Sequence, residues 1–351
     1  MLKLGVWRRD LFFSHPPAGL LERLYHRLSK TRVSLHLLQL PPEPSESDVA
    51  FFERLMPYVQ LSNGVYRTTN RGRFSELDPL VNALLADRFS PATQLRIEDW
   101  AASDCFTSYE WAKSLFPIFP KLELAASDFL LFLVEAKRAG TREWFVFEPD
   151  GKPLQYVRPP FVVRLWKPEA WLFPLNRFLH SYALRRWQRL KHQWTLPADW
   201  LAGLDHSPIE RNGYELRKLP LVHPEALRLS RRDSRFSIRR QSIFDAPKGR
   251  CQAVRTMNIL NREYFSPEQL ARGIRNAVDG LEAGGIWIVG RTVSENPRRH
   301  EVTIFEKQNS GELKPIERLG RGSEIESLAV ETCAADARLD FDQTSSKQRE
   351  P

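Results

Sequence analysis

Three polar side chains lie at the ends of short apolar segments. Asp99, Asp128 and Asn258 each follow such a segment closely. In an open parallel sheet, ligands bind beyond the carboxyl ends of the strands, so a polar side chain at a strand end, such as that of Asp128, is placed to face a ligand. A carboxylate at a strand end can accept hydrogen bonds from two neighbouring hydroxyls, such as those of a ribose. The sequence therefore predicts a ligand site in which Asp128 holds a pair of hydroxyl groups.

Small side chains follow Asp99. Ala101, Ala102 and Ser103 would let the backbone of a turn approach a ligand. No glycine lies between Ile97 and Leu115, although a turn that needs positive φ is strained at alanine or cysteine. Two interpretations are open. The turn binds its ligand in a changed shape, or the site has lost its ligand and the chain is a scaffold.

A basic segment rich in tryptophan lies in the middle of the chain. Residues 159–194 hold seven Lys or Arg, one acid and four Trp. Apolar residues at helical spacing from Leu175 to Trp194 predict an amphipathic helix, and such stripes most often pack against a core. Alternatively, the segment covers a substrate pocket, or its basic face meets an anionic membrane surface. The basic residues assigned to a membrane contact are Arg177, Arg185, Arg186, Arg189 and Lys191.

The composition is that of a basic globular protein. Its 351 residues are 42% hydrophobic and 27% charged, with 52 Lys and Arg against 43 Asp and Glu. The length predicts about two domains. The positive charge favours anionic partners, among them phosphate-bearing cofactors, nucleic acid and acidic membranes.

Several classes of protein are disfavoured by what the sequence lacks. Three distant cysteines without C-x-x-C spacing argue against a disulfide framework and a zinc site, so we predict no metal. No G-x-S-x-G, H-E-x-x-H or phosphate-loop pattern occurs, which disfavours hydrolases, zinc proteases and P-loop NTPases. Without a signal-peptide pattern or a long apolar run, we expect a cytoplasmic protein, which the membrane alternative would place at the inner face of a membrane.

Strands and helices alternate around the candidate site. This alternation predicts a doubly wound, mostly parallel, Rossmann-like α/β sheet. Asn309-Ser310-Gly311 predicts an antiparallel hairpin at its C-terminal end. The predicted helices are Leu77–Arg88, Thr107–Leu115 and Pro267–Ala283, and the predicted strands are Leu95–Ile97, Leu122–Asp128, Trp144–Glu148, Ser237–Phe244, Ala253–Met257, Ile286–Gly290, Glu301–Lys307 and Leu313–Leu319.

In this order, the segments resemble the class I S-adenosylmethionine-dependent methyltransferases. The resemblance covers about residues 77–320 apart from the insertion, and it is carried by Leu95–Thr107, Asp128, Arg239–Asp245, Cys251–Leu260 and Gly280–Gly290. It implies methyl transfer from S-adenosylmethionine to an unidentified acceptor. It further implies that Ala101 to Ser103 shape the first turn, that Asp128 holds the ribose, that Ile243 and Phe244 flank the adenine, and that Asn258 lies beside the methyl donor. Asp99 is also among the cofactor-binding residues that it implies.

The turn without glycine is similar to the Ala- and Ser-rich turn of the chemotaxis-receptor methyltransferases. Asn258-Ile259-Leu260 with Tyr264-Phe265 is also similar to a motif of that group. The likeness favours a variant turn that still binds the cofactor.

The domain prediction follows from this resemblance. It comprises an N-terminal cap region (1–76), the first half of a methyltransferase-like domain (77–158), a basic amphipathic insertion (159–212), the second half (213–327) and a disordered tail (328–351). The main alternative function is a non-catalytic methyltransferase-like scaffold that docks a membrane surface or a protein partner through 159–194. Nucleic-acid modification is a third hypothesis, and it predicts binding that weakens steeply with salt.

Overall fold

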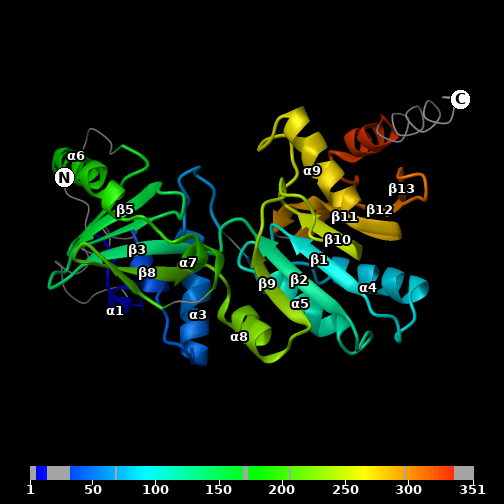
Figure 1. Cartoon of the computed structure of the whole chain (residues 1–351), viewed down its shortest axis with the longest axis horizontal. Coiled ribbons are helices and arrows are strands. Elements are labelled where there is room, and N and C mark those ends of the chain that lie inside the picture. Colours follow the sequence, from blue (N-terminus) through cyan, green and yellow to red (C-terminus); the bar gives the residue numbers. More distant parts are fainter. Residues whose placement is uncertain are drawn as a thin grey trace, which may run out of the picture. The chain divides into compact units, whose positions relative to one another are not determined.

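The computed structural model divides the chain into two compact units (Figure 1). Unit 1 comprises residues 1–69 and 130–224, and unit 2 comprises residues 70–129 and 225–351. The structure describes residues 5–13, 32–67, 69–168, 173–204, 207–295 and 298–335. The sequence therefore enters unit 1, passes to unit 2, returns to unit 1 and ends in unit 2.

Unit 2 contains a seven-stranded, mostly parallel sheet. The order is β13-β12-β11-β10-β1-β2-β9, and every pair from β11 to β9 is parallel. The last two pairs, β11 with β12 and β12 with β13, are antiparallel. The strands are β1 (Arg96–Trp100), β2 (Glu123–Asp128), β9 (Phe236–Arg240), β10 (Cys251–Met257), β11 (Leu281–Glu295), β12 (Arg298–Lys307) and β13 (Leu313–Leu319). This confirms the predicted doubly wound sheet with an antiparallel C-terminal edge.

Helices cover both faces of this sheet (Figure 1). On β10, Val254 packs in one apolar cluster with Leu270 and Ile274 of α9, whereas the next residue, Arg255, faces Trp111 of α5. Successive side chains of a strand point to opposite faces, so α9 and α5 lie on different sides. The helices of unit 2 are α4 (Leu77–Arg88), α5 (Phe106–Leu115), α8 (Pro224–Arg232), which begins at the boundary between the units, and α9 (Pro267–Asp279).

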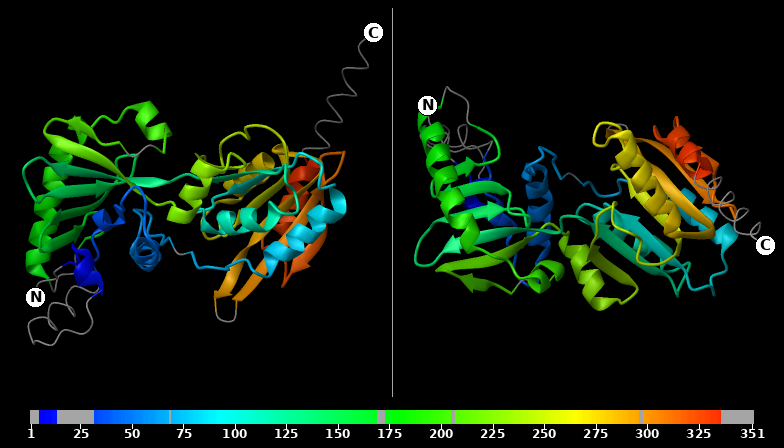
Figure 2. Two further views of the ribbon diagram at one scale, coloured as in Figure 1. Left: turned by 90° about the horizontal axis from the view of Figure 1, so that it is seen from below. Right: turned by 45° about the horizontal axis from the view of Figure 1, so that its top comes forward.

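Unit 1 contains a separate antiparallel sheet of six strands (Figure 2). The order is β6-β5-β4-β3-β8-β7, and each neighbouring pair is antiparallel. Its strands are β3 (Phe132–Arg138), β4 (Trp144–Phe147), β5 (Pro153–Arg158), β6 (Phe161–Arg164), β7 (Ile209–Arg211) and β8 (Tyr214–Pro220). Its helices are α1 (Arg9–Phe13), η1 (Leu35–Leu38), α3 (Glu46–Leu55), η2 (Met56–Tyr58), α6 (Pro174–Leu190), η3 (Lys191–Gln193) and α7 (Ala198–Ala202).

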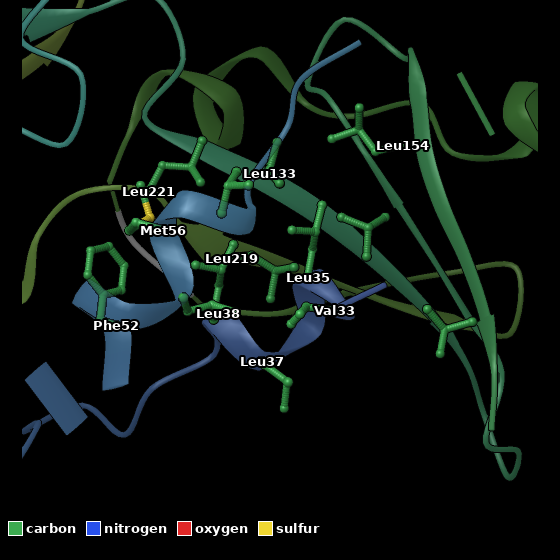
Figure 3. Close-up of a cluster of buried hydrophobic side chains, with 14 of the residues drawn as sticks. Val33, Leu35, Leu37, Leu38, Phe52, Met56, Leu133, Leu154, Leu219 and Leu221 are labelled. Atoms are coloured by element: carbon green, nitrogen blue, oxygen red, sulfur yellow. The ribbon is translucent and has the colours of Figure 1, made fainter. Parts of the chain in front are cut away.

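The two faces of the antiparallel sheet have different covers. Leu35 and Leu38 from the N-terminal segment pack against Leu133 of β3 and Leu219 of β8 (Figure 3). On the opposite face, Trp187 of α6 packs against aromatic side chains of β4. The ring centroids of Trp187 and Phe147 are 5.0 Å apart. Both faces of β4 are buried, so this strand is apolar at every position, which is also how parallel strands read in a sequence.

The predicted domain boundaries need correction. Residues 130–158 and 213–224 were predicted to belong to the methyltransferase-like domain, but they belong to unit 1. The reason is strand pairing: β4, which contains most of the predicted strand Trp144–Glu148, pairs with β3 and β5 and not with the parallel sheet. The insertion therefore runs from 130 to 224, and residues 1–69 form one unit with it.

The tail prediction is also wrong at its start. Residues 326–335 form a helix, and its Ala329 and Cys333 are buried in the apolar cluster that contains α9. The rest of the predicted tail, 336–351, lies outside the described residues. Among the described residues, no helix combines the length and the apolar character needed to cross a bilayer.

Candidate functional site

The turn after β1 adopts an unusual backbone. Ala101, Ser103 and Cys105 have φ values of 55°, 56° and 61°, all in the left-handed region. This region favours glycine, because a β-carbon there costs about 1–2 kcal/mol per residue. The turn is fixed at both ends: the amide of Ala102 donates to the Ser127 carbonyl (2.9 Å), and the amide of Cys105 donates to the Ala102 carbonyl (2.8 Å). Three residues thus hold, without glycine, a conformation that usually requires it.

Asp128 joins this turn to the end of β2. The backbone amide of Ser103 donates a hydrogen bond to Oδ2 of Asp128 over 2.9 Å. The residue is 8% exposed, so its carboxylate lies at the edge of the sheet with little contact with solvent. The structure therefore brings together Ala101, Ser103 and Asp128, which the sequence placed at one site.

Asp99 lies beneath the turn and has another role. Its Oδ1 accepts from Nε of Arg255 over 3.0 Å, and its Oδ2 accepts from Nη2 of Arg255 and from Oγ of Ser108. Asp99 is 2% exposed. Both carboxylate oxygens serve this buried network, so we assign Asp99 to positioning β1 and not to contact with a ligand.

A second carboxylate shares the same guanidinium. Asp78 of α4 accepts from Nη1 of Arg255 over 2.8 Å. Burial raises the pKa of Asp78 to about 7. The nearby carboxylates of Asp99 and Glu110 also raise this pKa, whereas the positive charge of Arg255 lowers it. Arg255 is fully buried, and its guanidinium lies 4.2 Å from the ring centroid of Trp111. The network fixes α4 and α5 against β1 and β10, and so holds the base of the first turn.

The loop after β9 carries Ile243 and Phe244. Ile243 is buried in the cluster that contains Trp100 and Leu260. Phe244 packs edge-on against Phe265, with ring centroids 5.1 Å apart. The carbonyls of Ile243 and Phe244 accept from side chains of α9, namely Asn276 (2.9 Å) and Arg272 (2.7 Å). Both residues follow a strand whose carboxyl end lies beside Asp128, and α9 holds the loop in place.

Asn258 lies at the end of β10 with φ of 62°. Its side-chain carbonyl accepts from the amide of Thr292 over 2.7 Å, and its own amide donates to the carbonyl of Gly290 over 2.8 Å. The residue therefore ties β10 to β11 at the same edge of the sheet as the turn after β1.

Two polar residues at this edge were missed by the sequence analysis. Oγ of Ser127 and the carboxamide of Gln241 are buried and have no hydrogen-bond partner among the described residues. The amide of Gln241 donates to the carbonyl of Asp128 over 3.1 Å, so its backbone lies beside that residue. Buried polar groups usually have partners, so these atoms are available to hydrogen-bond a ligand at this edge. In the sequence, only their positions near the ends of predicted strands could have identified Ser127 and Gln241 as candidate site residues.

These groups fit a ligand with hydroxyls and further polar atoms. The open turn, the carboxylate bonded to it and the two polar side chains without partners all lie at the carboxyl ends of adjacent parallel strands. Nucleoside ligands of doubly wound sheets bind at this edge.

The predicted basic helix is α6, and it uses only part of its apolar stripe for packing. Ala183 and Trp187 are buried against the antiparallel sheet, whereas Leu175, Phe178 and Tyr182 are 46%, 61% and 37% exposed. Arg186, one of the residues assigned to a membrane contact, instead forms an ion pair with Glu143 (3.0 Å) and donates to the hydroxyl of Tyr182 (2.9 Å). The remaining basic residues of the predicted set are exposed: Arg177, Arg185, Arg189 and Lys191.

Comparison with known proteins gives structural neighbours only. No family model matches the chain, and no curated protein matches it. The sugar N-methyltransferase KedS8 from Streptoalloteichus sp ATCC 53650 matches 76% of this chain and 81% of its own, at 13% identity and a TM-score of 0.29. The S-adenosylmethionine-dependent methyltransferase SibL matches 62% of this chain, at 12% identity and a TM-score of 0.26.

A third neighbour is the O-methyltransferase NcsB1 from neocarzinostatin biosynthesis, in complex with S-adenosyl-L-homocysteine and 1,4-dihydroxy-2-naphthoic acid. It matches 62% of this chain, at 12% identity and a TM-score of 0.24. The match spans only 36% of SibL and 40% of NcsB1. At these identities and scores, the function of this chain rests on the geometry of its own site.

Proposed function

We propose that the carboxyl edge of the parallel sheet in unit 2 binds S-adenosylmethionine and that the protein transfers its methyl group to an acceptor molecule. The observation that carries the proposal is the left-handed turn at Ala101 and Ser103, bonded to Asp128. This turn supports the proposal because its backbone holds the left-handed shape despite the cost of three side chains there.

Different residues contact different parts of the bound cofactor. Asp128 accepts hydrogen bonds from the two ribose hydroxyls, and the turn presents the backbone of Ala101 to Ser103 to the ligand. Ile243 and Phe244 flank the adenine, and Asn258 lies beside the donor group. The sulfonium of the bound cofactor supplies the reactivity, so the protein mainly aligns nucleophile, methyl group and sulfur.

Calorimetric titration with S-adenosylmethionine and S-adenosylhomocysteine tests this proposal. We expect both to bind the full chain. Asp128→Asn should weaken binding by about tenfold or more, because hydrogen bonds to a charged group contribute about 1.5–3 kcal/mol each. Asparagine retains a side-chain oxygen that can accept from Ser103, which preserves the turn.

The matched control is Glu123→Gln, at the opposite, exposed end of the same strand. It should bind both compounds like the wild type. A folded protein that binds neither compound would refute the proposal and favour the scaffold interpretation. Equal affinity of the Asp128→Asn variant would refute the role of Asp128.

A second candidate function is docking to an anionic membrane surface through α6. The exposed apolar residues Leu175, Phe178 and Tyr182 recur at helical spacing, and exposed Arg and Lys residues on the same helix match the negative charge of acidic lipids. Vesicles of phosphatidylcholine with phosphatidylglycerol test it. Arg185→Gln with Arg189→Gln should weaken binding by about 2 kcal/mol, or roughly 30-fold, at about 1 kcal/mol per charge.

The charge-matched control is Lys152→Gln with Arg211→Gln, at exposed positions of the same unit away from α6. It should bind the vesicles like the wild type. Equal loss in both double variants would assign the affinity to net charge and exclude α6 as the docking surface.

A further inference from the structure

Unit 1 contains a cavity of its own, with a volume of about 580 Å³. It lies where the start of the N-terminal segment meets β3, β4 and β8. Its volume falls in the range of about 300–1,000 Å³ that is typical of sites for small molecules. The lining residues are Trp7, Arg8, Arg9, His36, Leu37, Gln39, Glu135, Lys137, Thr141, Arg142, Trp144, Pro159 and Arg217.

The charge of the lining is strongly positive. Five lining residues are Arg or Lys and only Glu135 is acidic. Arg217 is engaged by Glu215 and by Gln39. In contrast, Lys137 and Arg142 pair with no acid among the residues that the structure describes. These two cations can therefore bind an anion without giving up an ion pair.

The single acid does little to oppose an anion. Glu135 is 3% exposed, and burial raises its pKa to about 7. The negative charge of Glu215 also raises this pKa, whereas the positive charges of Lys137 and Arg217 lower it. At neutral pH, a large share of this carboxyl is therefore protonated, and in that form it can donate a hydrogen bond.

One wall of the cavity is aromatic. The rings of Trp144 and His36 have centroids 4.6 Å apart, and burial lowers the pKa of His36 to about 4, so this imidazole is neutral. Trp144 is 7% exposed, and its Nε1 has no hydrogen-bond partner among the described residues. A buried donor without an acceptor is uncommon in folded proteins, and here it belongs to a wall of the cavity.

We propose that this cavity is a binding site for a small molecule that carries a phosphate or carboxylate group on a planar ring. The anionic group lies between Lys137 and Arg142, and the ring packs against the aromatic wall formed by Trp144 and His36. This site is independent of the S-adenosylmethionine site, because every lining residue belongs to unit 1.

Calorimetry of the full chain with four probes tests the proposal. The probes are 1-naphthyl phosphate, 2-naphthoate, 1-naphthol and inorganic phosphate. The first two share an anion and a ring and should bind most tightly, and the stronger of them identifies the anionic group. 1-Naphthol and inorganic phosphate each lack one of the two parts and should bind at least about tenfold more weakly.

Two variants locate the site. Lys137→Gln and Arg142→Gln should each weaken the tighter anionic probe by about tenfold or more, as expected for loss of a charge-assisted hydrogen bond. Arg142 is exposed, so its variant should fold even if Lys137→Gln does not. Lys152→Gln, an exposed lysine outside the cavity, is the control and should bind like the wild type.

Three results would overturn the proposal. These are no binding of either anionic ring compound, equal binding of 1-naphthol, and unchanged affinity in the Arg142→Gln variant. Titration of each variant with S-adenosylmethionine separates this site from the site in unit 2. The variants should leave that affinity unchanged, and Asp128→Asn should leave the naphthyl probes unaffected.

Discussion

The two sheets bury their acidic side chains in different ways. In the parallel sheet, Asp99 is bonded through both oxygens by Arg255 on the neighbouring strand, and Glu98 pairs with Arg239. In the antiparallel sheet, Glu135 has basic neighbours, but it lines a cavity. Glu98 and Asp99 of the parallel sheet therefore serve the fold, whereas Glu135 of the antiparallel sheet lines a cavity that a ligand can enter.

The difference shows where each unit can bind a molecule. With the strand acids Glu98 and Asp99 used internally, unit 2 offers a site built mainly from backbone turns and the strand-end residue Asp128. Unit 1 has no comparable turn among its described residues and offers side chains on a sheet face instead. A backbone site tolerates changes of side chain that a side-chain site does not.

The largest expected effect comes from breaking the buried network of unit 2. Arg255→Leu leaves Asp99 and Asp78 without their guanidinium. Breaking a buried ion pair by removing one partner costs about 3–5 kcal/mol, because the remaining charge is buried without compensation. Denaturant-dependent hydrogen exchange of β1 and β10 measures this loss separately from unit 1.

Two controls belong to this measurement. Arg96→Leu removes an exposed arginine at the first position of β1, and it should change the stability of unit 2 by no more than about 0.5 kcal/mol. Asp99→Leu with Arg255→Leu should recover part of the loss, because an apolar pair of similar size can replace a buried ion pair, while Asp78 still lacks its partner. A loss below about 1 kcal/mol in Arg255→Leu would show that the network does not hold the two strands.

The next effect concerns the antiparallel sheet and depends on pH. The unfolded chain releases the proton of Glu135 near pH 4.5, whereas the folded chain releases it near pH 7. Between these values the folded state binds a proton that the unfolded state lacks, so the stability of unit 1 falls as the pH rises. Glu135→Gln removes this loss and should stabilise unit 1 at pH 8 by about 3 kcal/mol, at about 1.4 kcal/mol per pH unit.

Denaturation at pH 5 and at pH 8, followed by hydrogen exchange in β3 and β4, measures this effect. The variant should gain little at pH 5 and most at pH 8. Glu210→Gln, on the exposed edge strand β7, is the control and should show no such difference between the two pH values. An equal gain at both pH values would mean that burial does not hold Glu135 protonated.

The sequence predicted unit 2 far better than unit 1. The helix Leu77–Arg88 and the strand Leu313–Leu319 were predicted with their observed bounds, because their apolar periodicity and turn residues are local signals. The strand-end positions of Asp128 and Asn258 were predicted from the same signals, whereas their roles in binding stay predictions. The hydrogen bonds of Asp99 could not be predicted, because its partner Arg255 is 156 positions away in the chain.

Unit 1 could not be predicted in the same way. Its strands are buried on both faces, as in β4 and β5, so their sequences do not tell antiparallel from parallel pairing. Its cavity brings together residues as distant as Arg8, His36, Lys137 and Arg217, which no spacing pattern connects. Side-chain sites formed by long-range pairing require the structure, whereas turn sites at strand ends can be recognised in the sequence.

The smallest expected effect tests the backbone nature of the unit 2 site. Ala101→Gly removes a β-carbon from a residue with φ of 55° and should stabilise unit 2 by about 0.5–1 kcal/mol, as relief of strain exceeds the entropy that glycine adds to the unfolded chain. Ala102→Gly is the matched control: Ala102 does not have positive φ, so its replacement should destabilise by about 0.5–1 kcal/mol.

We expect Ala101→Gly to stabilise unit 2, Ala102→Gly to destabilise it, and Ala101→Gly to retain affinity for S-adenosylmethionine. This result would show that the turn keeps its shape through its backbone hydrogen bonds. Destabilisation by Ala101→Gly would instead mean that the alanine side chain itself holds the turn. The contrast between a backbone site in unit 2 and a side-chain site in unit 1 would then no longer hold.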